Sequence, residues 1–179
     1  MSLRHALLGL LTAGPASGYD LLKLFEISLA NVWPATQSQV YAELNRLADA
    51  GLVKVAAEGP RGRKEYVLDE RGLAELRHWL TDVPPAGNPR NEMLLRVFFL
   101  GQVEPDRARA FLRAQGERAA AQHERLNAIR EVAAGDDDLA VYGRLALEWG
   151  LRASAMQRDW AEWAEEQLAE AAAARARPA

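Results

Sequence analysis

Apolar positions in the first half of the chain recur three or four residues apart, which is the spacing of amphipathic helices. The first such stripe ends before Gly14 and consists of Leu3, Ala6, Leu7, Leu10 and Leu11. Ser17 and Asp20 have the spacing of a capping box, so a second apolar helix is expected from there towards Trp33. We predict that both helices belong to one core, together with the side chains of Tyr19 and Trp33.

A third helix is expected to begin at Thr36, because Thr36 and Gln39 repeat the capping-box spacing. Its apolar side consists of Val40, Leu44 and Leu47. The other positions carry amides, hydroxyl groups and a guanidinium, on Gln37, Ser38, Gln39, Tyr41, Asn45 and Arg46. Amides read adenine edges, guanidinium groups read guanine or phosphate, and hydroxyl groups reach phosphate. We therefore predict a helix that binds in the DNA major groove; an ordinary solvated helix face is the alternative.

A two-stranded hairpin is predicted after the third helix. Gly51 ends that helix in the manner of a left-handed cap, and the apolar runs at 52–55 and 65–68 are predicted to be strands. The turn between them is basic, because it brings together Arg61, Arg63 and Lys64. Asp69 then caps a fourth helix. Three helices and a hairpin with a basic tip form the winged helix-turn-helix plan, in which the hairpin, or wing, contacts the DNA backbone.

A linker rich in proline and glycine separates two domains. It contains Pro84, Pro85, Gly87 and Pro89 within eight positions. These residues exclude a helix there, so we predict a winged-helix domain over 1–82, a linker over 83–89 and a helical domain over 90–179. The helical domain opens with a short, very apolar helix near 92–100, which we expect to be buried on several sides.

The last helix carries a seam of residues at alternating spacings of three and four: Leu139, Tyr142, Ala146, Trp149, Ala153, Met156, Trp160, Trp163 and Gln167. This pattern is typical of a contact between helices. Large rings on an otherwise charged helix need a partner surface, so we expect a homodimer, with packing inside one chain as the alternative. The residues assigned to the dimer contact are Leu126, Ile129, Tyr142, Trp149, Met156, Trp160 and Trp163.

Composition narrows the class of protein. Of the 179 residues, 49% are hydrophobic and none is cysteine, which favours two small intracellular domains in the cytoplasm. No window of about twenty residues lacks charge, so no membrane span is expected. The net charge is −3, and residues 1–82 hold nine Lys or Arg against ten Asp or Glu. Attraction to DNA must therefore come from the local basic cluster, because screening limits charge effects to about 8 Å.

The sequence does not indicate an enzyme. His5, His78 and His123 fall in three separate helices without ligand-spaced neighbours, so neither a metal site nor a histidine general base is expected. The acidic run at 136–138 suits a helix start, where the macrodipole favours negative charge. The glycines at 59–62 lack the Lys-Ser/Thr pair of a phosphate-binding loop. We expect no metal and no cofactor.

Four segments in order resemble the PadR family of transcriptional regulators: SGYDLLKLFE, the Trp33-Pro34 turn, SQVYAELNRLADAGLV and GPRGRKEYVLDERG. The resemblance covers most of residues 1–80. Asp69, where the family more often has Thr, and Glu65 in the basic wing depart from it. The resemblance implies a homodimeric repressor that binds a pseudo-palindromic DNA operator and is released by a small aromatic or drug-like ligand.

The resemblance also suggests a ligand pocket between the domains. Aromatic side chains available to line it are Trp33, Phe98, Phe99, Tyr142 and Trp149, for which core packing is the alternative. Two other functions stay open at this point. One is a MarR-like regulator, although such chains usually have dimer helices at both ends. The other is a winged-helix module that binds protein rather than DNA.

Overall fold

The computed structural model describes residues 2–29, 32–59, 63–85, 87, 91–132, 135 and 137–176. Contacts within the chain divide it into two compact units, Met1–Gly87 and Asn88–Ala179. Each unit has its own arrangement of helices and is described by itself.

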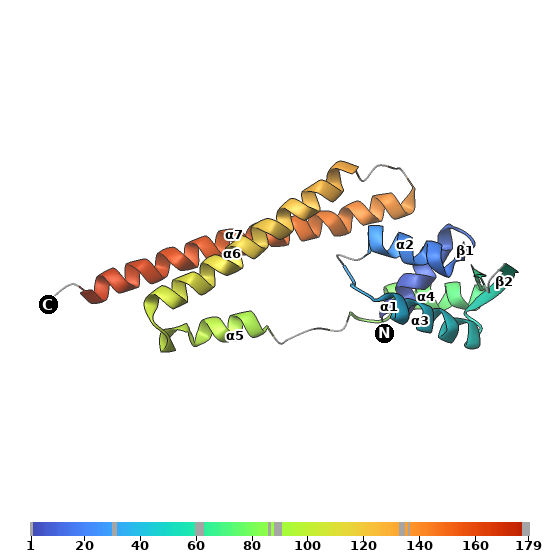
Figure 1. The fold of residues 1–179 in the computed structure, drawn as a ribbon, viewed down its shortest axis with the longest axis horizontal. Helices are drawn as coiled ribbons and strands as arrows, with labels where there is room; N and C mark the ends of the chain where they lie inside the picture. Colours follow the sequence, from blue (N-terminus) through green and yellow to red (C-terminus); the bar gives the residue numbers. More distant parts are fainter. Residues whose placement is uncertain are drawn as a thin grey trace. The chain divides into compact units, whose positions relative to one another are not determined.

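Unit 1 is built around four helices (Figure 1): α1 at Ser2–Leu10, α2 at Gly18–Ser28, α3 at Gln37–Asp49 and α4 at Glu70–Thr81. A short 3-10 turn, η1 at Leu11–Ala13, extends α1. The predicted caps are confirmed, because Ser17 and Thr36 form reciprocal capping boxes and Asp69 accepts a hydrogen bond from the Arg71 amide. These caps satisfy amides that would otherwise lack partners at the helix starts.

A three-stranded antiparallel sheet packs against these helices. Its strands are β1 at Ala16–Ser17, β2 at Val53–Gly59 and β3 at Arg63–Leu68, in the order β1-β3-β2. β2 and β3 form the predicted wing, with an irregularity in register between Val55 and Ala57. Gly51 precedes β2 with φ of 66°, the left-handed cap that the sequence indicated. The sequence analysis missed β1, because two residues leave no alternation to recognise.

The core of unit 1 joins all of its helices to the wing. Its fully buried side chains include Leu7, Leu8, Leu21, Phe25, Val40, Leu44 and Leu47. The three predicted apolar positions of α3 are among them, so the opposite side of that helix is left for solvent. Tyr66 of β3 is also buried, as its alternation with Leu68 predicted. The fold class is therefore confirmed as a winged helix-turn-helix followed by a helical unit.

Two aromatic side chains lie outside this core. The sequence analysis assigned Tyr19 and Trp33 to it, but they are 61% and 43% exposed within the described chain. That prediction is wrong. Tyr19 falls on the outer face of α2, where the buried positions are Leu21, Leu22 and Phe25.

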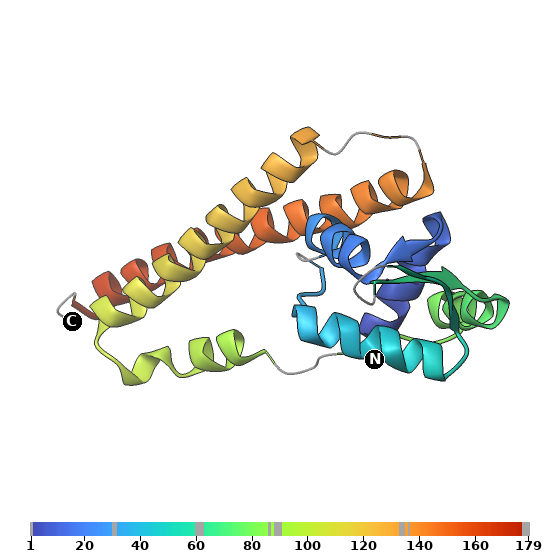
Figure 2. The same cartoon turned by 45° about the vertical axis from the view of Figure 1, so that its right-hand side comes forward.

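Unit 2 consists of a short helix and two long ones: α5 at Glu92–Phe98, α6 at Pro105–Val132 and α7 at Asp138–Ala176. A 3-10 turn, η3 at Leu100–Gln102, joins α5 to α6. Figures 1 and 2 show α6 and α7 side by side and running in opposite directions. No described helix of either unit is long and apolar enough to cross a membrane.

Small residues let α6 and α7 approach closely. A Cβ placed on Gly150 would lie 3.0 Å from Leu126, and one on Gly116 would lie 3.3 Å from the Cβ of Ala161. The contact also contains a polar group, because His123 Nδ1 lies 3.0 Å from the hydroxyl of buried Ser154. These pairs fix which face of α7 packs on α6.

α5 differs from the prediction. It was expected to be buried on several sides, but none of its described residues is buried, and Phe98 is 88% exposed. Its cap is Asn91, whose side chain accepts from the Leu94 amide at 3.1 Å, whereas Asn88 and Pro89 lie outside the described residues. A seven-residue helix with so little support is marginally stable by itself.

Candidate nucleic-acid interface

The polar face of α3 is available to a ligand. Gln37, Ser38, Gln39, Asn45 and Arg46 are exposed, and Tyr41 is half-buried. The remaining face is fixed by the buried Val40, Leu44 and Leu47, which have no exposed surface. The core therefore determines which side chains α3 presents, as the sequence predicted.

The first turn of α3 is already ordered by hydrogen bonds. Gln39 Oε1 accepts from the Thr36 amide at 2.8 Å and from the Thr36 hydroxyl at 3.1 Å. Its carbonyl is thus occupied, and its NH₂ group remains to donate. Ser38 Oγ lies 3.1 Å from Thr36 Oγ1. Among the described residues, no side-chain hydrogen bond engages Gln37 or Asn45, so both amides can read base edges.

Glu43 sets the electrostatics at the middle of α3. Its Oε2 accepts from Arg46 Nη1 at 2.8 Å, and its Oε1 accepts from Arg4 Nε of α1 at 3.4 Å. The Glu43 side chain is mostly buried, whereas that of Arg46 is 68% exposed. Arg46 is therefore held in one direction and keeps other N–H groups for phosphate or guanine, but with part of its charge neutralised.

Tyr41 is positioned by two neighbours, Gly18 and Tyr66. Its ring lies against the start of α2, where a Cβ on Gly18 would approach Tyr41 Cε1 to 2.6 Å. Burial, followed by the nearby Tyr41 phenol, raises the pKa of Tyr66 above its ordinary value. Tyr41 thus connects α3 to α2 and to the wing strand. It is both a packed ring and a half-exposed phenol, which combines the two roles that the sequence left open.

The wing is described in part. Lys64 is exposed on β3 beside exposed Glu65. Arg61 and the side chain of Arg63 lie outside the described residues. At the base of the wing, Lys54 of β2 forms an ion pair with Asp69, the cap of α4. This pair attaches the wing to α4.

The residues assigned to a dimer contact lie on two surfaces. Tyr142, Trp149, Met156 and Trp163 are all more than half exposed, at intervals of seven residues along α7. Trp160 and Ile129 are half-buried, and Leu126 is buried. Leu126 packs against α7 at Gly150 within its own chain.

The aromatic residues assigned to a ligand pocket are all exposed, and none lines either cavity found among the described residues: Trp33, Phe98, Phe99, Tyr142 and Trp149. Trp33 belongs to unit 1 and the others to unit 2. The described residues also contain no cluster of three or more His, Cys, Asp or Glu that could hold a metal ion.

Comparison with known proteins gives the same architecture. Residues 7–78 match the transcriptional regulator PadR-like family, and residues 89–169 match the virulence activator alpha C-terminal family. The negative transcriptional regulator PadR of Bacillus subtilis is 35% identical over 102 residues, which cover 55% of this chain and 56% of that protein. The chain spans about half the length of the curated relatives it matches.

Solved structures match over a longer range. B. subtilis PadR in complex with operator DNA has a TM-score of 0.80 at 27% identity, covering 94% of this chain and 99% of that one. The same protein in complex with p-coumaric acid gives 0.81 at 28% identity, with the same coverage. The Vibrio cholerae virulence activator AphA gives 0.73 at 27% identity, covering 96% of this chain and 98% of that one.

The winged helix and the outward polar face of α3 define a transcriptional regulator rather than an enzyme. The chain belongs to the PadR-like family of transcriptional regulators. This replaces the MarR-like alternative that the sequence left open.

Proposed function

We propose that the protein is a cytoplasmic homodimeric repressor that binds a pseudo-palindromic DNA operator. The observation that carries this proposal is the exposed polar face of α3 on a winged-helix core. In the related winged-helix plan, such a helix enters the major groove and the wing follows the backbone. The complex of B. subtilis PadR with operator DNA supports the same use of the fold here.

The side chains divide into two kinds of contact. Gln37, Gln39 and Asn45 offer amides for base edges, and Arg46 offers a guanidinium for guanine or phosphate. In the wing, Arg61, Arg63 and Lys64 supply positive charge for phosphates, which positions the protein without reading sequence. Tyr41 adds a phenol at the junction of the two.

A second copy is proposed because α7 leaves a long apolar stripe uncovered. Tyr142, Trp149, Met156 and Trp163 lie on a face that α6 does not cover in the described chain. Monomeric proteins rarely expose contiguous apolar patches of this kind. A twofold dimer would present two α3 helices to half-sites one helical turn, or a multiple of it, apart.

An effector belongs to the same proposal. A small aromatic or drug-like ligand would change the spacing of the two α3 helices and release the DNA. The complex of B. subtilis PadR with p-coumaric acid supports this part. A ligand that prefers one spacing by about 1.4 kcal/mol shifts the binding equilibrium about tenfold.

A mobility-shift titration against the DNA upstream of the gene tests the proposal. We expect affinity to fall steeply with salt, with a log–log slope of several units, because each neutralised phosphate releases counterions. The double variant Arg61→Ala and Arg63→Ala should reduce that slope by about two. A protein-interaction module would show no binding that depends on salt in this way, and an unchanged slope would remove the wing from the interface.

A further inference from the structure

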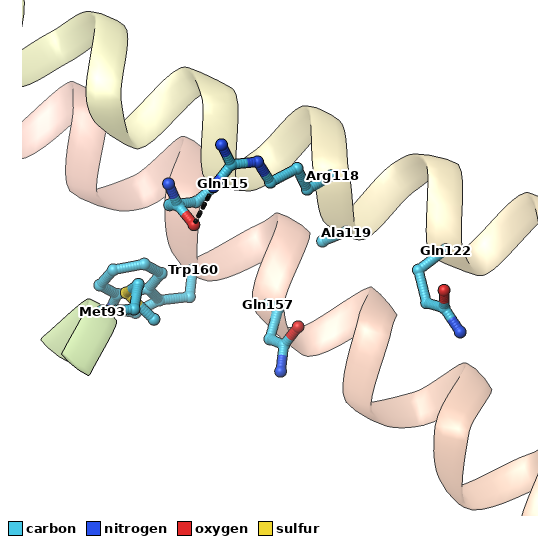
Figure 3. Close-up of a pocket in the computed structure, with 7 residues that line it drawn as sticks. All are labelled: Met93, Gln115, Arg118, Ala119, Gln122, Gln157 and Trp160. Atoms are coloured by element: carbon cyan, nitrogen blue, oxygen red, sulfur yellow. Dashed lines mark hydrogen bonds between the residues drawn. The ribbon is translucent and has the colours of Figure 1, made fainter. Parts of the chain in front are cut away.

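A groove in unit 2 has a chemistry that the sequence analysis did not identify. Its volume is about 140 Å³, and it lies where α5 faces α6 and α7 (Figure 3). The residues that line it are Met93, Gln115, Arg118, Ala119, Gln122, Gln157 and Trp160. None of them was assigned to a ligand site from the sequence, because glutamines spread over two helices form no local motif.

One end of this groove is apolar and flat. Trp160 of α7 presents its indole, and the Met93 thioether of α5 lies over the ring (Figure 3). Ala119 of α6 is buried between them and the polar end, so it leaves space rather than filling it. A planar ring can contact an indole edge and a thioether favourably.

The other end consists of donors. Arg118 supplies a guanidinium, and no Asp or Glu lines the groove. Arg118 Nη1 donates to Gln115 Oε1 at 3.4 Å, and Arg125 donates to Gln122 Oε1. These two amide oxygens are therefore directed to arginines, and their NH₂ groups are left as the polar atoms for a ligand. A site with one positive charge and several N–H donors suits an acceptor with negative charge.

We propose that this groove binds a planar aromatic monocarboxylate. The ring lies against Trp160 and Met93, and the carboxylate accepts from Arg118 and from the neighbouring glutamine amides. The volume matches a ligand with a single ring and a short side chain. This inference rests on the proposed function, because it assigns the effector of that function to residues within unit 2.

The position of Met93 gives the ligand a route to the DNA-binding unit. Met93 is the residue of α5 that lines the groove, and α5 has no buried described residue to hold it in place. A ligand that bridges Met93 to α6 and α7 adds the missing contact. Since α5 is the first helix after the linker from the winged helix, occupancy of the groove changes how that winged helix is carried.

Isothermal titration of the full-length protein tests the site, with p-coumaric acid and its neutral methyl ester as probes. Arg118→Gln should weaken binding of the acid by about tenfold or more and leave the ester unchanged, because a charge-assisted hydrogen bond is lost. Arg130→Gln, an exposed change on the same helix, is the matched control and should bind both probes as the wild type does. Trp160→Leu should weaken both probes.

Two outcomes overturn the site. One is the absence of acid binding by the wild-type protein, and the other is equal acid binding by wild type and Arg118→Gln. Trp160 is half-buried, so thermal melting must first show that Trp160→Leu is folded. Arg118 is exposed, which makes Arg118→Gln informative even if the tryptophan variant fails to fold.

The route through α5 has a separate test. The acid should lower operator affinity of the wild type and have a smaller effect on Met93→Ala at concentrations that saturate both proteins. An equal effect would remove α5 from the route. If the protein binds no operator without ligand, the proposed function fails, and the titration still reports on the groove. If it binds operator but no aromatic acid, the inference about the groove fails alone.

Discussion

Gly18 and Tyr41 are in such close contact that no larger residue fits between them. A Cβ on Gly18 would lie 2.6 Å from Tyr41 Cε1 and 3.3 Å from its Cδ1 and Cζ. The start of α2 therefore sets the position of a ring on α3, two elements that the sequence separates by the whole turn before Thr36. The glycine in the Gly-Tyr-acid segment thus has a steric reason for its presence.

Gly18→Ala should displace Tyr41 and lower operator affinity. The added methyl group makes a contact that real structures do not tolerate, so the ring or α2 must move, at a cost of about 1–3 kcal/mol in folding free energy. Urea denaturation and a mobility-shift titration measure the two effects. Gly9→Ala is the matched control, because a Cβ there meets nothing within 4 Å. Equal DNA affinities for the two variants would separate Tyr41 from DNA binding.

Local signals made the DNA-binding unit predictable. Two capping boxes, the Gly51 cap and the three apolar positions of α3 are short-range features, and they placed the polar face correctly. The contacts of Glu43 with Arg4 and of Tyr41 with Gly18 were not predictable, because they join residues far apart in sequence. No spacing rule reports such pairs.

The Lys54–Asp69 ion pair should make stability depend on acid pH. The hydrogen bond from Lys54, then that from the Arg71 amide, lowers the pKa of Asp69 below its ordinary value. A carboxyl group with a lower pKa in the folded state contributes stability above about pH 4, and this contribution is lost as the pH falls through the folded-state pKa. Asp69→Asn keeps the cap and removes the charge.

We therefore expect Asp69→Asn to be less stable than the wild type at pH 7, and the difference to shrink towards pH 3. Urea denaturation at both pH values measures it. Asp49→Asn, at the exposed end of α3, is the matched control, since Asp49 forms no ion pair among the described residues. A difference that stays constant from pH 7 to pH 3 would show that the charge of Asp69 does not contribute.

The helical unit was harder to predict because α7 has two faces with helical spacing. The sequence analysis followed the large rings, whereas the face that packs on α6 uses small residues such as Gly150, Ser154 and Ala161. Small residues give a weak sequence signal but permit close helix approach. The same reasoning placed α5 in a core, since an apolar run does not reveal whether its cover comes from the same chain.

Trp149→Glu should convert the proposed dimer to a monomer. Trp149 is 75% exposed in the single chain, so the change should leave the chain folded while placing a charge in the proposed contact. Sedimentation velocity measures the change in mass. Ala169→Glu, an exposed substitution on another side of α7, should remain dimeric. Persistence of the dimer in Trp149→Glu would place the contact between copies on a different surface.

Glu43→Gln should increase affinity for DNA and its dependence on salt. Glu43 holds a negative charge against Arg46 on the helix proposed to face DNA, and its loss would leave the Arg46 charge fully available to phosphate. We expect operator affinity to rise by about twofold to tenfold at low salt, and discrimination against unrelated DNA to fall, because phosphate contacts carry no sequence information. Mobility shifts with operator and random duplexes measure both quantities. Glu26→Gln, on the exposed side of α2, controls for the change in net charge; a matching rise in that variant would show that the general field of the protein, rather than the Glu43–Arg46 pair, sets DNA affinity.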